Sequence, residues 1–304
     1  ACGVCGGVHA TASALSIEMA LGIKPPPLGI VVRNLLLSCE YLYDNPLHLF
    51  VLSGPDYSES LVKDTNPEIW EKAVSAKTKF SDVHGYATIA EIMTDLNPLS
   101  GKLYLEALTM TRVAREAYVL LGGKYPHPET VIPGGVTTMI TLTTLNEFYI
   151  KLHRFFDYSK KCVGIWDDIY DFFYECDPDY RDCGRLPATM VDFGQWDHED
   201  YYDATYENCN AWGEKRWSTP GAVVEGKLVT TRLQERNTRF IPFNKGRDNG
   251  AGNPYVSALE SGYATEYLWR DIWSKNSLLD ILQHFLHHEK PIGRRKKGKA
   301  LGKL

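Results

Sequence analysis

The chain has 304 residues and a formal net charge of −5, with 44% hydrophobic and 23% charged residues. This composition is typical of a globular protein with a sizeable core, and its charge offers no overall attraction to nucleic acid or to an anionic membrane. Seven cysteines are too few for a disulfide scaffold in a chain of this length, and no apolar run approaches the ~18 residues of a membrane span. We therefore expect a globular protein of a reducing compartment.

The first part of the chain predicts two helices. Residues 10–21 lack glycine and proline and are followed by a glycine and three nearby prolines, which should end a helix. Residues 28–43 carry apolar side chains at helical spacing, with Cys39 on the apolar stripe and Arg33 and Glu40 outside it. We expect Cys39 to be a buried thiol.

The middle of the chain predicts further helices at residues 67–80, 103–121 and 136–173, the last being one very long helix or two in tandem. The polar stretch 53–67 is typical of a loop. Residues 122–135, "GGKYPHPETVIPGG", read as a rigid loop because glycines and prolines punctuate them.

Towards the C-terminus the pattern changes from helical to mixed. Short β-branched runs on either side of "EGK" predict a hairpin within residues 221–233. Residues 258–288 predict another helix, and the ending "GRRKKGKALGKL" reads as a solvated basic tail. The fold class expected from these patterns is mainly α: a helical bundle core of long helices with a small β-hairpin portion.

The opening "ACGVCGGVHATAS" brings Cys2, Cys5 and His9 together just ahead of the first predicted helix. A CxxC pair by itself fits half of a zinc site, a dithiol redox couple or half of a cluster-binding site. A zinc site calls for a second CxxC, and the other cysteines, at positions 39, 162, 176, 183 and 209, do not contain one. A thioredoxin-type couple calls for a βαβ setting, whereas the sequence around the pair predicts helix.

Several segments together resemble the large subunit of nickel–iron hydrogenases. They are "CGVCGGVHATAS", "IKPPPLGIVVRNLL", "DNPLHLF", "GGKYPHPETVIPGGVT" and "WSTPGAVVEGKLVTT", in the family's order and at similar spacing along at least residues 1–232. The resemblance implies a large-subunit-like domain over residues 1–245, which is partial. It leaves residues 246–288 as a divergent helical segment and 289–304 as a disordered basic tail.

The resemblance also implies the site residues and the cofactor. Cys2 would be a terminal nickel ligand and Cys5 would bridge nickel and iron, so both would be metal ligands and catalytic residues of a Ni–Fe centre whose iron carries CO and cyanide. Thiolates are soft ligands that suit these metals. His9, one helical turn after Cys5, would donate a hydrogen bond to the bridging sulfur, and His127 would brace its loop near the cofactor or a partner surface.

The activity implied by the resemblance is heterolytic oxidation of H2 or reduction of protons, with electrons passing to an iron–sulfur small subunit. We expect a cytoplasmic location, or membrane association through partners only. The family completes its metal site with a second cysteine pair, Asp-Pro-Cys-x-x-Cys, which this sequence lacks. The chain is therefore expected to be part of a longer protein and inactive by itself.

Two alternatives have no hydrogenase activity. The first is a hydrogenase-like scaffold subunit of a redox complex, from which the metal site has been lost. The second is a zinc-stabilised helical interaction module, which would fold only with metal. Retention of Cys2, Cys5 and His9 favours the enzyme, because a scaffold has no use for a paired thiol site.

Overall fold

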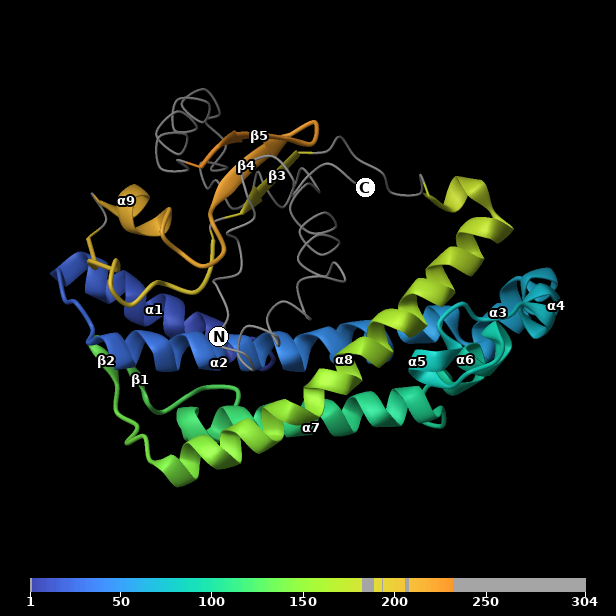
Figure 1. Ribbon diagram of the computed structural model, residues 1–304, viewed down its shortest axis with the longest axis horizontal. Coiled ribbons are helices and arrows are strands. Elements are labelled where there is room, and N and C mark those ends of the chain that lie inside the picture. Colours follow the sequence, from blue (N-terminus) through green and yellow to red (C-terminus); the bar gives the residue numbers. More distant parts are fainter. Residues whose placement is uncertain (1, 182–188, 193, 206–207, 232–304) are drawn as a thin grey trace, which may run out of the picture. The chain divides into compact units, whose positions relative to one another are not determined.

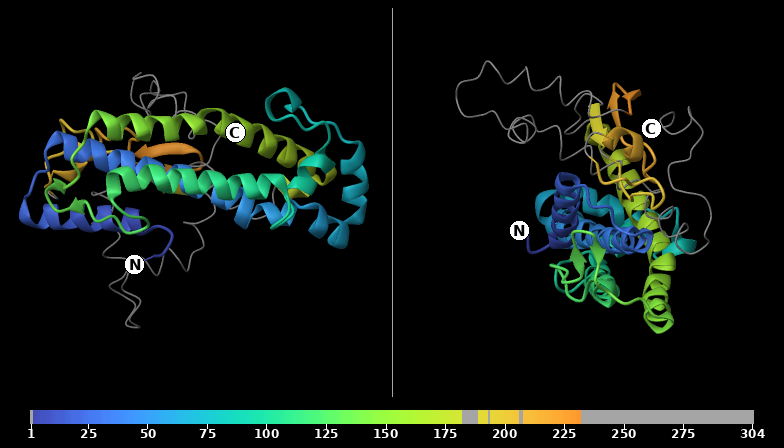
Figure 2. Two further views of the ribbon diagram at one scale, coloured as in Figure 1. Left: turned by 90° about the horizontal axis from the view of Figure 1, so that it is seen from below. Right: turned by 90° about the vertical axis from the view of Figure 1, so that its left-hand side faces the viewer.

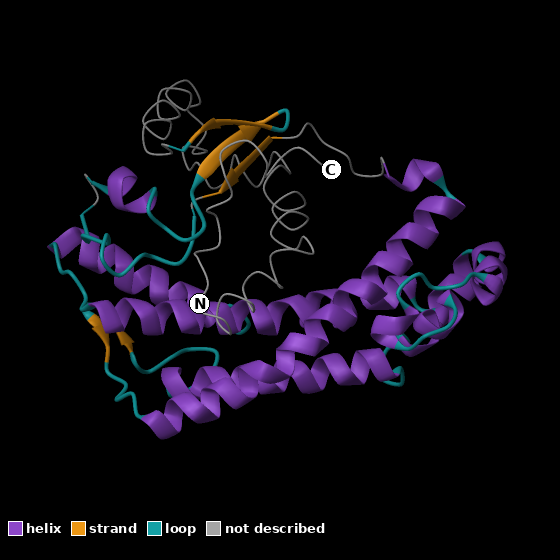
Figure 3. Cartoon of the chain, in the orientation of Figure 1, coloured by secondary structure: helices purple, strands orange, loops and turns teal. Residues whose placement is uncertain are grey.

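A computed structural model of the chain describes residues 2–181, 189–192, 194–205 and 208–231 (Figure 1). These residues are mostly helical and hold two small sheets (Figure 3), which confirms the predicted mainly α class. None of the helices in these ranges is long and apolar enough to cross a membrane. The predicted helix at 258–288 and the tail at 289–304 lie outside the described residues.

The chain divides into two compact units. The first unit contains residues 1–37, 129–137 and 186–304, and the second contains residues 38–128 and 138–185. The helices of the first unit are α1 (Gly6–Leu21), the start of α2 (Pro27–Pro46) and α9 (Cys209–Gly213). Its strands are β1 (Val131–Ile132), β2 (Gly135–Val136), β3 (Thr189–Asp192), β4 (Gly221–Val224) and β5 (Lys227–Thr230).

Helix α1 ends where the sequence predicts and begins earlier. Gly22 ends it in the left-handed conformation, at φ +66°, and the Ile23 N–H donates to the Glu18 carbonyl at 3.0 Å. Its first residue is Gly6 rather than residue 10, so the glycine-rich step is helical and Cys5 is the residue just before the helix. The prediction that the cysteine pair lies ahead of a helix is confirmed.

The predicted hairpin is present as β4 and β5. Glu225 and Gly226 at its turn both have positive φ, 51° and 74°, as the tightest hairpin turns require. β3, which the sequence did not predict, pairs antiparallel with β4 and gives the sheet order β3-β4-β5. The antiparallel strands β1 and β2 lie in the stretch expected to be loop.

The second unit is built from helices around α7 (Lys102–Gly122) and α8 (Leu142–Cys176), which lie side by side (Figure 2). The predicted helix at 103–121 is confirmed as α7. The helix expected over 136–173 is one continuous element, but it begins at Leu142, because β2 occupies residue 136 and Thr141 caps the helix by accepting the Thr144 N–H at 3.1 Å.

The second unit also contains short helices. They are η1 (Leu47–Leu52), η2 (Gly54–Tyr57), α3 (Glu59–Thr65), α4 (Pro67–Ser75), α5 (Ser81–His84), α6 (Ile89–Asp95) and η3 (Pro178–Arg181). Helix α3 occupies a stretch that the sequence predicted as a loop. The helix predicted at 67–80 stops at Ser75. The Lys79 and Phe80 N–H groups donate to the Asp168 carboxylate of α8, at 2.7 and 3.1 Å, instead of continuing the hydrogen bonding of α4.

Helix α2 is buried at Cys39 of its apolar stripe, as predicted, and also at two charged residues outside that stripe. Cys39 is 1% exposed, and burial, together with the nearby charge of Glu40, raises the pKa of its thiol, as expected of a buried cysteine. Arg33 and Glu40, however, are also buried, at 4% and 2% exposed. α2 is covered on more than its apolar face, and its charged residues are held by polar partners inside the protein.

Candidate metal centre

Cys2 and Cys5 form a small turn that leads into α1. The Cys2 Sγ accepts the backbone N–H groups of Val4 and Cys5, both at 3.3 Å. Both cysteine side chains are half-buried thiols rather than halves of a disulfide. Amide donors directed at a sulfur suit an anionic thiolate, and partial exposure keeps both sulfurs accessible to a metal ion.

The two predicted histidines lie in different places. The His9 N–H donates to the Cys5 carbonyl at 3.3 Å, one helical turn away as expected, while its imidazole is exposed. His127 is half-buried in the loop after α7 and belongs to the second unit. The hydrogen bond from His9 to the Cys5 sulfur and the bracing role of His127 stay predictions.

Helix α1 is anchored by a buried ion pair that the sequence analysis missed. Glu18 of α1 is 0% exposed, and both its carboxylate oxygens bind the Arg33 guanidinium of α2, at 2.6 and 3.0 Å. Glu18 also accepts the Gly134 N–H at 2.7 Å and the Tyr202 hydroxyl at 3.0 Å. Burial, and next the charge of Glu18, raise the pKa of that tyrosine, so its hydroxyl stays a donor.

Arg33 extends the same cluster to the β1-β2 hairpin. Its guanidinium donates to the carbonyls of Ile132, at 2.6 Å, and Gly135, at 3.0 and 3.3 Å. The hairpin packs so closely on α2 that a Cβ added at Gly29 would lie 3.1 Å from the Gly135 Cα. The cluster therefore fixes α1, α2 and the hairpin to one another. A charged residue among apolar neighbours on each of two adjacent helices was the only sequence signal for it.

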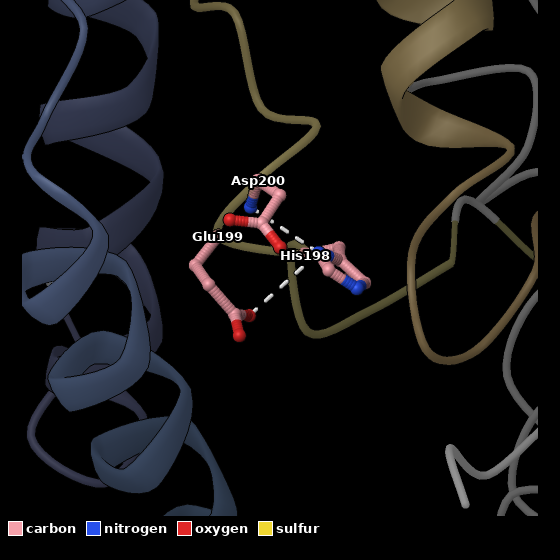
Figure 4. A group of neighbouring side chains, drawn as sticks. All are labelled: His198, Glu199 and Asp200. Atoms are coloured by element: carbon pink, nitrogen blue, oxygen red, sulfur yellow. Dashed lines mark hydrogen bonds and ion pairs between the residues drawn. The ribbon is translucent and has the colours of Figure 1, made fainter.

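A second group of potential ligands, at 198–200, also went unnoticed in the sequence. Within the described ranges, His198, Glu199 and Asp200 form the one cluster of three such side chains whose ligand atoms lie within 4.8 Å of one another (Figure 4). The Asp200 N–H donates to His198 Nδ1 at 3.2 Å, and Glu199 Oε2 lies 3.8 Å from the same nitrogen. Because that nitrogen already accepts a hydrogen bond, we interpret the group as a local turn of polar residues.

The thiols of Cys162 and Cys176 do not resemble metal ligands. Cys162 is buried on α8, and burial is the largest cause raising its pKa. Cys176, at the end of the same helix, is half-buried, and its pKa is also raised mainly by burial. Thiols held in their neutral form in this way are poor ligands, in contrast to the amide-bonded turn at Cys2. Cys183 lies outside the described residues.

The thiol pair fits part of a transition-metal site. Cysteine sulfur is the donor that nickel and iron–sulfur chemistry favour, and a spacing of three residues is typical of two cysteines that bind one metal site. Two thiolates do not fill the coordination of a two-metal centre. The residues present therefore fit one side of such a centre, and further ligands would have to come from elsewhere.

Comparisons with known proteins show which family the chain resembles. The family model for nickel-dependent hydrogenase matches residues 1–88 and 80–176. The chain is 29% identical over 153 residues to the periplasmic [NiFeSe] hydrogenase large subunit of Desulfomicrobium baculatum, covering 48% of this chain and 27% of that protein. It is 30% identical over 161 residues to the hydrogenase-1 large chain of Escherichia coli K12, covering 44% and 27%.

Solved structures show the same relationship. The actinobacterial-type NiFe-hydrogenase from Ralstonia eutropha H16 is 40% identical with a TM-score of 0.76, covering 77% of this chain and 42% of that chain. A Ni-Fe-Se hydrogenase from D. vulgaris Hildenborough is 26% identical with a TM-score of 0.53, covering 75% and 41%. This chain thus spans less than half the length of these relatives.

The fold and the site define a class of protein: mainly helical, with a thiol pair just ahead of its first helix. The chain belongs to the nickel-dependent hydrogenase family. Within it, the sequence represents part of a nickel–iron hydrogenase large subunit. The family resemblance expected from the sequence is confirmed.

Proposed function

We propose that this chain is part of the catalytic large subunit of a nickel–iron hydrogenase that oxidises H2 or reduces protons. The observation that carries the proposal is the Cys2–Cys5 turn, a thiol pair with amide donors on its sulfur, in a chain of this family. A Ni–Fe centre, with CO and cyanide on the iron, would supply the redox and Lewis-acid chemistry that splits H2 heterolytically.

Within this proposal the residues of the chain have separate roles. Cys2 would hold nickel as a terminal ligand and serve as the base that takes the proton, and Cys5 would hold both metals. His9 would donate a hydrogen bond to the Cys5 sulfur and thereby adjust its electron density. The buried Glu18–Arg33 pair would keep α1, which carries Cys5 at its start, in a fixed orientation.

The proposal also covers the partner subunit, the extent of the large-subunit-like part of the chain and the location of the protein in the cell. Relatives named large subunits or large chains support a small-subunit partner, and we propose that it carries iron–sulfur clusters that receive the electrons. The large-subunit-like part would extend to about residue 245, followed by a divergent segment and a basic tail; the 77% of the chain shared with one hydrogenase structure supports this extent. We propose a cytoplasmic position or membrane association through partners, although one relative is named periplasmic.

H2-dependent reduction of a viologen dye by the complex purified from its source tests the proposed activity. The wild-type complex should reduce the dye under H2 and not under argon, and Cys5→Ser should abolish the reaction. Cys176→Ser, which changes a half-buried thiol with a raised pKa, should leave it intact. A folded complex without H2-dependent reduction would support the scaffold alternative.

A further inference from the structure

A buried carboxyl group of the second unit lies behind a groove that is open to solvent. The groove has a volume of about 530 Å³ and is lined by Arg112, Arg115, Glu116, Val119 and Tyr125. Both arginines and the glutamate on its rim are exposed, so water enters it freely. Tyr125 is half-buried and lines the groove on one side.

Tyr125 connects this groove to Glu40. The Tyr125 hydroxyl donates to Glu40 Oε2 at 3.3 Å, which is longer than the roughly 2.5–3.0 Å that is usual for a hydrogen bond between two oxygens. Glu40 itself is 2% exposed. Such contacts often lengthen in a resting protein and shorten when a proton moves. Tyr125 thus contacts the buried Glu40 carboxyl group through its hydroxyl and also lines a water-accessible groove.

The groups around this contact keep the tyrosines neutral. Burial, followed by the charge of Glu40, raises the pKa of Tyr125 and of Tyr118, whose rings pack 5.3 Å apart. Burial also raises the pKa of Tyr43, whose ring lies 5.1 Å from that of Tyr125, although the charge of nearby Arg115 opposes the shift. A neutral hydroxyl passes a proton by donating one and accepting another, without becoming an anion.

Two further titratable groups complete the surroundings. Asp44 lies one helical turn beyond Glu40 on α2, and burial raises the pKa of its carboxyl to about 6. Cys39 is buried next to Glu40, and its raised pKa keeps it a neutral thiol. The Arg115 guanidinium is 5.7 Å from the centre of the Tyr43 ring and contributes the positive charge at the groove wall.

We propose that Glu40 is a proton-holding group that exchanges its proton with the water of the groove through the hydroxyl of Tyr125. On uptake, the Tyr125 O–H bond breaks as its proton passes to the Glu40 carboxylate, and the phenolic oxygen takes a proton from hydronium in the groove, which becomes water. Release is the reverse. One proton is transferred in each direction and no electrons move.

The role of this proton exchange in turnover rests on the proposed function, because H2 oxidation releases protons and proton reduction consumes them. The exchange itself depends only on residues of the second unit. It can be measured on the full chain without metal or a partner. Failure of the test therefore leaves the hydrogenase proposal standing, and loss of hydrogenase activity does not bear on the exchange.

Time-resolved infrared spectroscopy after a light-triggered drop in pH tests the proposal on the full chain. The carbonyl band of protonated Glu40 is the part of the wild-type signal that Glu40→Gln removes. In Tyr125→Phe this band should appear about a hundredfold more slowly, the low end of what a positioned proton-transfer group contributes. Tyr125→His, which restores a group able to pass protons, should recover at least part of the rate.

Tyr118→Phe is the matched control. The buried hydroxyl of Tyr118 has no hydrogen-bond partner among the described residues. Phenylalanine keeps the ring that packs on Tyr125, so loss of the hydroxyl alone should not change the rate. Circular dichroism verifies the fold of each variant. An infrared signal unchanged by Glu40→Gln would overturn the proposal. So would a Tyr125→Phe rate equal to that of wild type, or a His variant that folds and remains as slow as the Phe variant.

Discussion

The carboxyl group of Asp44 makes stability depend on pH. Its folded-state pKa, about 6, lies above the ordinary value of 3.8 because burial disfavours the charged form. The folded protein therefore holds this proton more tightly than the unfolded chain. The stability it contributes is fully present below pH 3.8 and is lost as the pH rises through about 6.

Asp44→Asn should remove that dependence. Urea unfolding between about pH 4 and pH 7 should show a smaller loss of unfolding free energy in Asp44→Asn than in wild type. Asp64→Asn, on the exposed side of α3, is the control and should follow the wild-type profile. Equal slopes in all three proteins would show that Asp44 titrates as an ordinary surface carboxyl.

His84 and Asp168 form a buried pair that holds the segment between α4 and α5 on α8. His84 Nε2 donates to Asp168 Oδ2 at 2.8 Å, while its Nδ1 accepts the Tyr86 N–H at 3.1 Å. Both side chains are at most 1% exposed. The acceptor role of Nδ1 makes this imidazole a structural donor rather than a free base.

His84→Ala should lower the unfolding free energy by about 3 kcal/mol, because it leaves a buried carboxylate with one donor fewer and opens a cavity. His153→Ala, on the exposed side of α8, should change it by less than about 0.5 kcal/mol. Chemical denaturation of the three proteins measures both values. A similar, small effect for both histidines would contradict the role given to the buried pair.

His9 is the residue whose role the structure leaves as a prediction. Its imidazole is exposed next to the cysteine turn, so its loss should not disturb folding. In the purified complex, His9→Ala should retain nickel and turn over more slowly, by roughly tenfold, the low end for changes to groups that orient metal ligands. Wild-type turnover together with wild-type nickel would reduce His9 to a surface residue of α1.

At the scale of elements, the Glu18–Arg33 pair decides how α1 is held. Removing one partner of a buried pair leaves an uncompensated charge, so Arg33→Met should cost about 3–5 kcal/mol. Replacing both, as Glu18→Leu with Arg33→Met, should recover part of that loss. The recovery should be incomplete because the hairpin amide and carbonyls would still lack their partners.

A double-mutant cycle by urea denaturation measures this coupling. We expect the double variant to be more stable than the sum of the two single losses predicts. Strictly additive losses would mean that the two charges act independently, and the account of α1 as anchored by an ion pair would be wrong.

Elements with strong local signals could be predicted from the sequence. The end of α1 at Gly22, helix α7 and the β4-β5 hairpin depend on glycine, apolar spacing and turn residues that lie next to each other in the chain. The start of α8 and the end of α4 could not, because partners distant in sequence set them: β2 pairs with β1, and Asp168 takes the backbone donors after α4.

The candidate site was predictable to a similar extent. The Cys2–Cys5 spacing alone indicated a metal or redox site, and neighbouring segments indicated the family. The buried charges of Glu18, Arg33 and Glu40 were not predictable, because an amphipathic pattern assigns charged residues to the solvent side. Only tertiary packing shows that such residues have partners inside the protein.

At the scale of the whole molecule, the chain provides one thiol pair, Cys2 and Cys5. The Ni–Fe centre of the proposed function needs more ligands than these two. The chain spans 42% of a hydrogenase structure that it matches at 40% identity. Under the proposed function, the further metal ligands and the electron path would be supplied by groups other than this thiol pair. Whether Cys2 and Cys5 bind metal is therefore best tested by the nickel that the protein retains on purification.

The nickel content of the purified protein tests this metal-ligand assignment most directly. Protein purified from its source in its complex, without chelators, should contain close to one nickel per chain, and Cys5→Ser should remove it while Cys176→Ser retains it. Folded wild-type protein without nickel, or a Cys5→Ser variant with unchanged nickel, would contradict the assignment of Cys2 and Cys5 as metal ligands.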